Sequence, residues 1–327
     1  MFCIQDRMEK GFSSSSRIDL DLAIGSDQMI RRLVLIAAVV LFGSVIQTKA
    51  DAPTIISINQ LLGSAANYAV LGIGSSSAGN PAGTLNNSLV TINGNQGVGS
   101  GGHIINMGPS VINGNVFESQ TGQYGGPGHL NGSITTSGVL LNRNFADAMT
   151  AASLAASLSP TQSFGGISHT TTINGNGGLN VININGNITT SLILNGSASD
   201  IFIVNVTGTL SLTGSTVLGV SGGVTGNNVL YNFTGSGGTI TTHVNNMVNG
   251  TLLAPNYDFI LHSLNGRIIG GQNITLMSGA TVNGPTTPPP PVPEPTTMLL
   301  LGTGLVGVAA RLRRRRINRR DEVKPVE

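Results

Sequence analysis

The stretch PSVINGNVFES, residues 109–119, contains the motif that decides the fold: an apolar residue followed by Asn-Gly-Asn. Close copies occur as VTINGNQGV at 90–98, TTINGNGGL at 171–179 and VININGNIT at 181–189, with a looser copy, GHLNGSITT, at 128–136. Asn and Gly tolerate positive φ better than other residues, so each Asn-Gly pair is expected to turn a strand, with Gly114 at positive φ. The motif therefore predicts short strands joined by repeated turns.

The spacing of these pairs indicates stacked coils. Asn93, Asn113 and Asn131 are 20 and then 18 residues apart, and a period near 20 favours a solenoid. Inward Ile, Val and Leu would fill a narrow core, while Asn residues at corners would stack on those of neighbouring coils. Turns are predicted at Asn93, Gly94, Asn113, Gly114, Asn131, Gly132, Asn174, Gly175, Asn185 and Gly186, and the pair recurs at 195–196, 249–250, 265–266 and 283–284.

The predicted fold is all-β, a parallel β-solenoid with an irregular repeat and one α-helix packed alongside. Later Asn-Gly pairs fall 10 or 11 residues apart, which keeps a β-sandwich open as an alternative. One segment, NRNFADAMTAASLAASLSP at 142–160, breaks the strand pattern. It predicts a helix of about four turns from Phe145 to Leu158, with Asn144 as N-cap and a stop before Pro160.

Composition excludes several kinds of function. Charged residues are 9% of the chain, and Gly is 46 of its 327 residues. Between Asp51 and Gly284 there are five acidic residues, two arginines and no lysine, for a net charge of −3. A nucleic-acid partner is disfavoured because phosphate binding needs clustered Lys and Arg. The single cysteine, Cys3, precedes a predicted cleaved segment, so the mature chain would have neither thiol nor disulfide.

The N-terminal region has the pattern of a secretory signal peptide at residues 29–50. Two arginines precede an apolar run at 33–45, and small residues follow, so cleavage is expected after Ala50. A membrane-spanning anchor is the alternative, although the run is shorter than the roughly 20 residues that a span needs. Residues 1–28 are unpatterned, and Met29 is expected to be the true start.

The C-terminal region resembles the PEP-CTERM sorting signal of Gram-negative bacteria. A Pro-rich linker at 285–295 precedes a short predicted transmembrane helix with an arginine cluster at 296–316 and a cytoplasmic tail at 317–327. The sorting residues are Val292, Pro293, Glu294, Pro295, Arg311, Arg313, Arg314, Arg315 and Arg316. The resemblance implies export across the inner membrane, transient anchoring, exosortase cleavage, and a final place at the cell surface or in the extracellular matrix. An ordinary tail anchor is the alternative.

Residues 51–284, taken as one domain, resemble the choice-of-anchor A domain, an adhesin-like extracellular module. The resemblance rests on NYAVLGIG from Asn67, LYNF at 230–233, GTLLAP at 250–255 and NGRI at 265–268. A solenoid interrupted by a helix is also similar to bacterial ice-binding domains. The family resemblance implies attachment rather than catalysis.

No catalytic, cofactor or metal site is predicted. The acids are far apart in sequence, and the histidines (His103, His129, His169, His243 and His262) lack metal-ligand spacing. The sequence therefore predicts a non-enzymatic structural or adhesive protein, bound to exopolysaccharide or to neighbouring envelope proteins. One alternative is ice binding, suggested by the Thr-rich stretches HTTTING, ITTSLIL and GTITTH. The other is an exopolysaccharide-modifying β-helix enzyme, which would need a charged groove.

Overall fold

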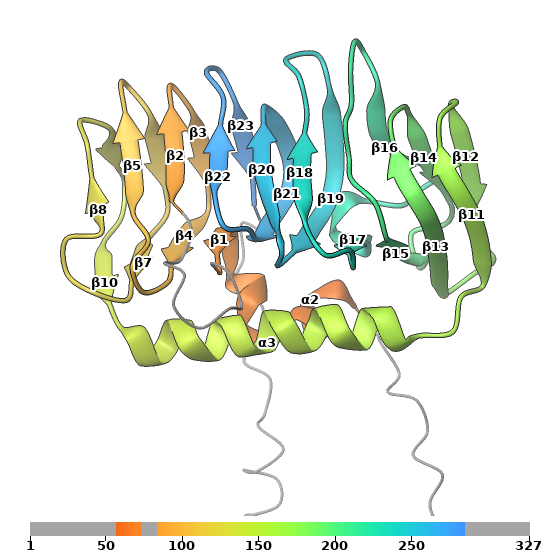
Figure 1. Ribbon diagram of the computed structural model, residues 1–327, viewed down its shortest axis with the longest axis horizontal. Helices are drawn as coiled ribbons and strands as arrows, with labels where there is room; N and C mark the ends of the chain where they lie inside the picture. The colour runs from red at the N-terminus through yellow and green to blue at the C-terminus, as the bar shows by residue number, and fades with distance from the viewer. Residues whose placement is uncertain (1–56, 74–83, 285–327) are drawn as a thin grey trace, which may run out of the picture. The chain divides into compact units, whose positions relative to one another are not determined.

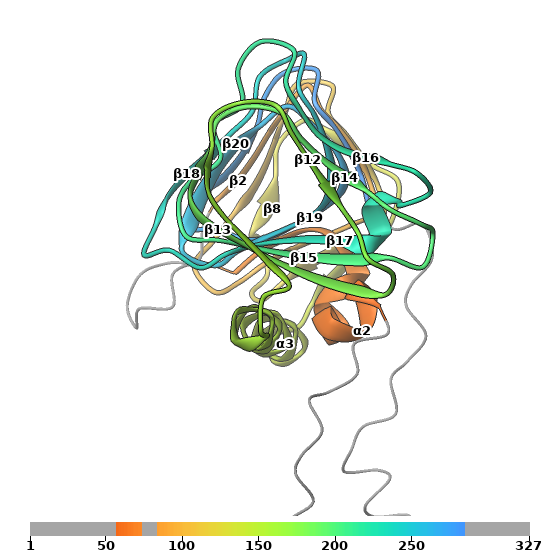
Figure 2. The same cartoon turned by 90° about the vertical axis from the view of Figure 1, so that its right-hand side faces the viewer.

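Parallel strand pairing builds the body of the protein. The computed structural model describes residues 57–73 and 84–284, and the predicted signal peptide, linker and sorting helix lie outside these ranges. All strand pairs among the described residues are parallel, which excludes a β-sandwich and confirms the solenoid. Figure 2 looks along the solenoid and shows coils of triangular outline, with α2 (Ile58–Leu62) and α3 (Gly138–Ser157) beneath one side.

One side of the triangle, the helix-covered face, runs the length of the solenoid. Its outward side packs against α3 through Ile203, Leu230 and Leu253. In order along the axis it contains β11 (Gln162–Ile167), β13 (Leu179–Ile188), β15 (Ile201–Val206), β17 (Val229–Phe233), β19 (Met247–Ala254), β21 (Ser263–Gly270), β1 (Tyr68–Gly72), β4 (Asn95–Val98), β7 (Val116–Glu118) and β10 (Ile134–Thr136).

The other two sides have no α-helix over them among the described residues, and only the 3-10 helix η2 (Gly226–Asn228) contacts the ladder-face corner, at β19 and β21. The ladder face contains β12 (Thr171–Asn174), β14 (Leu192–Asn195), β16 (Val217–Ser221), the first residues of β19 and β21, β23 (Thr281–Asn283), β3 (Thr91–Asn93), β6 (Val111–Asn113) and β9 (His129–Leu130). The open face contains β18 (Gly238–Thr241), β20 (Tyr257–Leu261), β22 (Ile274–Leu276), β2 (Leu85–Ser88), β5 (Ile104–Met107) and β8 (Tyr124–Gly125). Bridges from Ile188 to Leu210 and from Ser211 to Thr241 extend it toward β13.

The coils do not stack in sequence order. β1, near the start of the described chain, pairs with β21 on one side and β4 on the other. The chain winds from β1 to β10 at one end, crosses to β11 at the other end, and winds back until β23 pairs with β3. Helix α3 (Gly138–Ser157) makes this crossing along the helix-covered face (Figure 1). Its 20 residues span about 30 Å of the roughly 43 Å between the outermost strands.

The helix was predicted too short. Ser137 is the N-cap, because its hydroxyl accepts the backbone N–H of Leu140 at 3.3 Å, so α3 begins well before Phe145. Asn144, the predicted N-cap, lies buried inside the helix and donates to the Tyr68 hydroxyl. Short helices at α2 (Ile58–Leu62), η1 (Gly63–Asn67) and η2 (Gly226–Asn228) were not predicted. Within the described ranges, no helix has the length and apolarity needed to cross a membrane.

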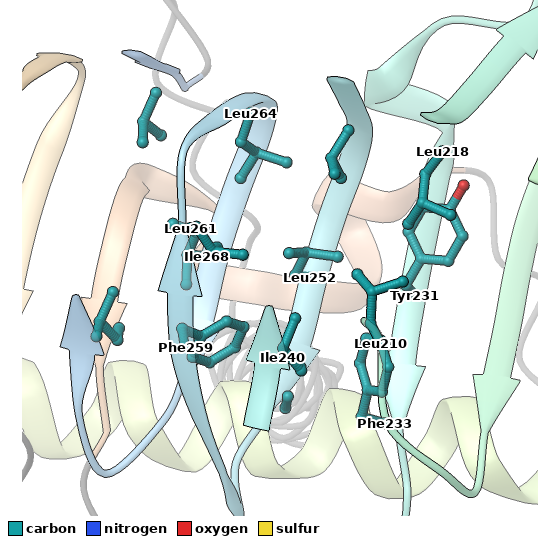
Figure 3. Packing of buried hydrophobic residues seen from close by; sticks show 14 of the residues in the cluster. Leu210, Leu218, Tyr231, Phe233, Ile240, Leu252, Phe259, Leu261, Leu264 and Ile268 are labelled. Carbon is teal, nitrogen blue, oxygen red and sulfur yellow. The ribbon is translucent and has the colours of Figure 1, made fainter. Parts of the chain in front are cut away.

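Apolar side chains fill two separate layers. The first is the solenoid interior, where Leu252 and Ile268 of the helix-covered face and Phe259 of the open face point toward one another (Figure 3). The second lies between the helix-covered face and the helices, and includes Leu141 and Ala148 of α3. Burying each large apolar side chain contributes about 1.5–3 kcal/mol. Each coil buries few such side chains because the interior is thin, so the stability of the solenoid comes from the number of coils.

Candidate functional site

Asparagine side chains form a hydrogen-bonded ladder along one edge of the ladder face. The Asn113 amide donates to Asn93 Oδ1 at 2.7 Å, and the Asn93 amide donates to Asn283 Oδ1 at 2.8 Å. The same run continues with Asn131 to Asn113 (2.8 Å), Asn283 to Asn265 (2.8 Å) and Asn265 to Asn249 (3.2 Å). A second run joins Ser221 to Asn195 (2.9 Å) and Asn195 to Asn174 (2.8 Å). Within each run, these contacts tie each coil to the next, and the Asn249 amide donates to the Leu218 carbonyl at 3.1 Å between the two runs.

The Asn-Gly pairs of the ladder lie at the corner between the ladder face and the helix-covered face. Gly94 has a φ of 134°, a conformation that glycine favours, but Gly114, Gly132 and Gly175 are outside the left-handed region. The expectation of positive φ at Gly114 was therefore wrong. Glycine is required there because a Cβ would lie 2.3 Å from the Gly94 carbonyl oxygen in the neighbouring coil.

The pair Asn185-Gly186 lies elsewhere. It is within β13, at the bend toward the open face, and Gly186 has a φ of 147°. Gly132 resembles Gly114, because a Cβ on it would lie 2.1 Å from the Gly114 carbonyl oxygen. The repeated Asn-Gly pair therefore has two structural roles. At some corners it allows a sharp bend, and at others its glycine lets the backbones of neighbouring coils come into contact.

The open face presents two columns of outward side chains, which we call the open columns. The inner column is Thr189, Ser211, Thr241, Ile260, Thr275, Asn86 and Ile105, and the outer column, two residues earlier in each strand, is Asn187, Thr209, Thr239, Asp258, Asn273, Thr84 and His103. All of these side chains are half-buried or exposed. Strand geometry places successive rows about 4.8 Å apart and the columns about 6.7 Å apart.

Much of the hydrogen-bonding capacity of the open columns is unused. The side chains of Thr241, Thr275 and Asn86 form no hydrogen bond to another described residue. The outer column is partly used, since Asp258 accepts the backbone N–H of Asn273 at 2.9 Å and Asn187 accepts the Thr209 hydroxyl at 3.3 Å. The face therefore offers hydroxyl and amide groups at regular spacing, with Ile260 and Ile105 between them.

The charged groups of the body have structural partners. Asp200 is buried at the corner after β14, where hydrogen bonds from Ser197 and Asn180 hold its pKa below the usual value. Arg267 is buried near α2, and burial lowers its pKa to about 10. Its guanidinium donates to the Ala66 carbonyl at 3.1 Å and the Thr251 hydroxyl at 3.3 Å.

The geometry gives no support to a catalytic groove. The remaining carboxylates are scattered: Asp147 on α3 accepts from Ser64, and Glu118 accepts backbone N–H groups near β8. Burial, and to a lesser extent His243, lower the pKa of His262 at the corner between the open and ladder faces. The described residues contain no group of three or more His, Cys, Asp or Glu placed to hold a metal ion.

Comparisons with known proteins identify two regions. A family model described as "Putative Ice-binding-like adhesive domain" matches residues 39–284, and the PEP-CTERM protein-sorting motif matches residues 291–315. The sorting residues from Val292 to Arg315 lie inside that motif, Arg316 follows it, and these residues and Ala50 are outside the described ranges. A search of curated protein sequences finds no match.

The solved structures to which this chain is similar include three ice-binding proteins. One from an Antarctic Biological Consortium is 22% identical with a TM-score of 0.48, and the match covers 67% of this chain and 88% of that one. One from the ascomycete Antarctomyces psychrotrophicus is 22% identical with a TM-score of 0.49, covering 69% and 98%. One from an Antarctic Flavobacteriaceae bacterium is 22% identical with a TM-score of 0.49, covering 68% and 46%.

Proposed function

Since the chain belongs to the family of ice-binding-like adhesive domains and carries a PEP-CTERM sorting motif, we propose that it is an exported surface protein that attaches through its open face. The proposed ligand is an extended polymer of the envelope or matrix, with exopolysaccharide first and a neighbouring envelope protein second. The proposal concerns binding, and it assigns no chemical step to the open columns.

The unused polar groups of the open columns are the observation that carries this proposal. Thr241, Thr275 and Asn86 lie on adjacent or nearly adjacent rows and have no internal partner. Each hydroxyl or amide contact contributes only about 0.5–1.5 kcal/mol net, so useful affinity needs many rows or many copies. The face has one carboxylate, Asp258, and no Lys or Arg. Binding should therefore be weak, multivalent and nearly independent of salt.

The decisive test compares two lysine substitutions in one coil. Thr275→Lys places a long cation in the middle of the open face, whereas Thr281→Lys places it on a half-buried strand position of the ladder face. The exported protein, immobilised, should retain purified exopolysaccharide at low and high salt. Retention should fall by about tenfold or more for Thr275→Lys and stay unchanged for Thr281→Lys. Equal retention by both variants would remove the open face from this role, and depolymerisation of the polysaccharide would instead indicate an enzyme.

Ice is a second candidate ligand, favoured by one part of the open columns. Rows 209–211 and 239–241 read Thr-Leu-Ser and Thr-Ile-Thr, so four hydroxyl groups occupy two adjacent rows of the open face. The grid is interrupted by Asp258 and His103, which makes it less regular than an ice lattice requires. Ice-crystal shaping by the exported protein, together with failure to retain polysaccharide, would transfer the assignment to ice.

Processing at the C-terminus is the remaining part of the proposal. The motif marks the chain for exosortase, and we place the cut near Pro293-Glu294-Pro295 and the signal-peptide cut after Ala50. The mature form would then contain the 51–284 domain with part of the linker, without Arg311 to Arg316. Mass spectrometry of surface-located protein should find both new ends, and an intact C-terminus there would contradict the cleavage.

A further inference from the structure

Among the described residues, both ends of the solenoid are open strand edges. At one end β8, β9 and β10 pair only with β5, β6 and β7, and at the other β11 and β12 pair only with β13 and β14. Figure 1 shows β8 and β10 at one extreme of the described body and β11 and β12 at the other. Each edge therefore presents backbone N–H and C=O groups without a strand partner among the described residues. Such an edge can pair with a strand from another chain.

Neither outermost coil carries the lysines or outward charges that usually prevent such pairing, and the nearest carboxylate, Glu118 in β7, is buried and accepts the Tyr124 N–H at 3.1 Å. Residues 119–136 at the β8–β10 end and residues 159–178 at the β11–β12 end contain no Asp, Glu, Lys or Arg. Each end has one proline, Pro127 or Pro160, and both prolines lie outside the strands. Natural edge strands are commonly protected by Lys, by inward charges or by a covering element. The absence of charge from both ends is compatible with an edge that has a partner.

The asparagine ladder gives the two ends complementary polarity. Every amide in the ladder donates toward the β12 end, as Asn131 does to Asn113 and Asn195 does to Asn174. Asn131 Oδ1 consequently accepts no hydrogen bond from a described residue at the β9 end, and Asn174 Nδ2 donates none at the β12 end. One end offers a side-chain acceptor and the other a donor at the same corner of the coil.

Apolar side chains are also incompletely covered at the ends. Tyr124 and Leu130 close the interior at one end and Phe164 at the other, and all three are only partly buried. Beside them, on β10 and at the start of α3, Ile134 is 48% exposed and Val139 is 85% exposed. Contact between two ends would remove these groups from water.

We propose that these ends bind each other, so that copies of this chain stack head to tail, with the β8–β10 end of one copy against the β11–β12 end of the next. The partner is a second copy because the opposite end of this chain supplies both continuing parallel strands and the matching amide. Two like ends would instead place acceptor against acceptor. Because the strands of each copy would continue those of the next along the solenoid axis, the contact repeats without closing into a ring and grows a filament whose open columns continue from copy to copy. This assembly does not depend on what the open face binds.

The test adds a lysine to one edge at a time in the exported protein. Thr135→Lys alters β10, Ser163→Lys alters β11, and Ser153→Lys on the exposed side of α3 is the control; all three side chains are exposed, so circular dichroism should show the native fold. In sedimentation velocity, wild type and Ser153→Lys should form larger species as concentration rises. Thr135→Lys or Ser163→Lys alone should stay monomeric, because each retains only one working end.

Mixing the two edge variants provides the sharper result. Thr135→Lys keeps an intact β11 edge and Ser163→Lys keeps an intact β10 edge, so the mixture should give dimers and nothing larger. Dimers of a single variant would mean that like ends pair, and would overturn the head-to-tail arrangement. A wild type that is monomeric at all concentrations, or assembles unaffected by both lysines, would overturn stacking through these edges.

Discussion

The ladder face and the open face are built from the same coils, yet they use their polar side chains in opposite ways. In the coil that contains β22 and β23, Asn283 on the ladder face donates to Asn265 and accepts from Asn93. Thr275, on the open face of that coil, has no side-chain hydrogen bond to a described residue. Polar groups that are satisfied internally stabilise the fold, whereas unsatisfied ones remain available to a ligand. We therefore expect stability and attachment to respond to different substitutions.

The largest effect on stability is expected at the corner glycines of the asparagine ladder, where the backbones of neighbouring coils are in contact. Gly114→Val would place a Cβ 2.3 Å from the Gly94 carbonyl oxygen, and backbone at that distance cannot give way as a side chain can. We expect the free energy of unfolding to fall by about 3 kcal/mol, or the protein to fail to fold. Gly125→Val on the open face is the matched control, because its Cβ would meet nothing within 4 Å. Thermal unfolding of the pair measures the difference, and equal melting temperatures would contradict the close-contact explanation.

The Asn-Gly repeat made the coil predictable because its causes are local. Alternation of Ile182 and Ile184 with Asn indicates which side chains point inward, and the spacing of Asn93, Asn113 and Asn131 gives the coil length directly. The order of coils had no such local cause. Val70 pairs with Ile268, and nothing near either residue in sequence specifies a partner so far away. The start of α3 was missed because Gly138, its first residue, has a low helix propensity, although Ser137 is a good N-cap.

The candidate site was less predictable than the ladder. GTITTH supplies Thr239 and Thr241, but the rows that extend them come from distant segments, including Asn86 and Ile105. A column of outward residues exists only once the coil order is known. The burial of Arg267 was equally unpredictable. Its position after an Asn-Gly pair favours the surface, whereas in the fold it is buried and donates to the Ala66 carbonyl. The sequence could therefore indicate which residue types a binding surface would use, but not which face of the solenoid carries them.

The second largest effect on stability is expected at Asp200, which is buried at the corner after β14. Asp200→Asn removes a buried carboxylate that accepts the Ser197 hydroxyl at 2.7 Å and the Gly177 N–H at 2.9 Å. Since folding lowers the pKa of Asp200, its stabilising contribution is complete above the unfolded pKa of about 3.9 and is lost as pH falls through the folded value. The variant should melt below wild type at pH 7, and the gap should narrow near pH 3. Asp258→Asn, on the half-exposed open face, should change the melting temperature less. A gap that is unchanged between the two pH values would argue against the carboxylate as its cause.

The third effect is smaller and belongs to the ladder itself. Asn93→Ala removes two exposed or half-exposed amide contacts, at 2.7 and 2.8 Å, and leaves the partner amides able to bind water. We expect the free energy of unfolding to fall by about 1 kcal/mol, measured by urea denaturation. Retention of polysaccharide should be unchanged, because the open columns are intact. Loss of retention with native stability would place the ligand on the ladder face and reverse the comparison.

The smallest effect on stability is expected from the same substitution on the open face. Asn86 is half-buried in β2, between Thr275 and Ile105, and its side chain forms no hydrogen bond to a described residue. Asn86→Ala should therefore shift the free energy of unfolding by less than about 0.5 kcal/mol, since no internal contact is lost. The same variant should weaken retention measurably, because one row of the ligand contact disappears and the loss is repeated in every copy of a multivalent array. Urea denaturation and retention on immobilised polysaccharide, applied to Asn86→Ala and Asn93→Ala together, should thus give opposite results for one residue type on two faces. If both variants lose stability and neither loses retention, the open face is only another part of the scaffold.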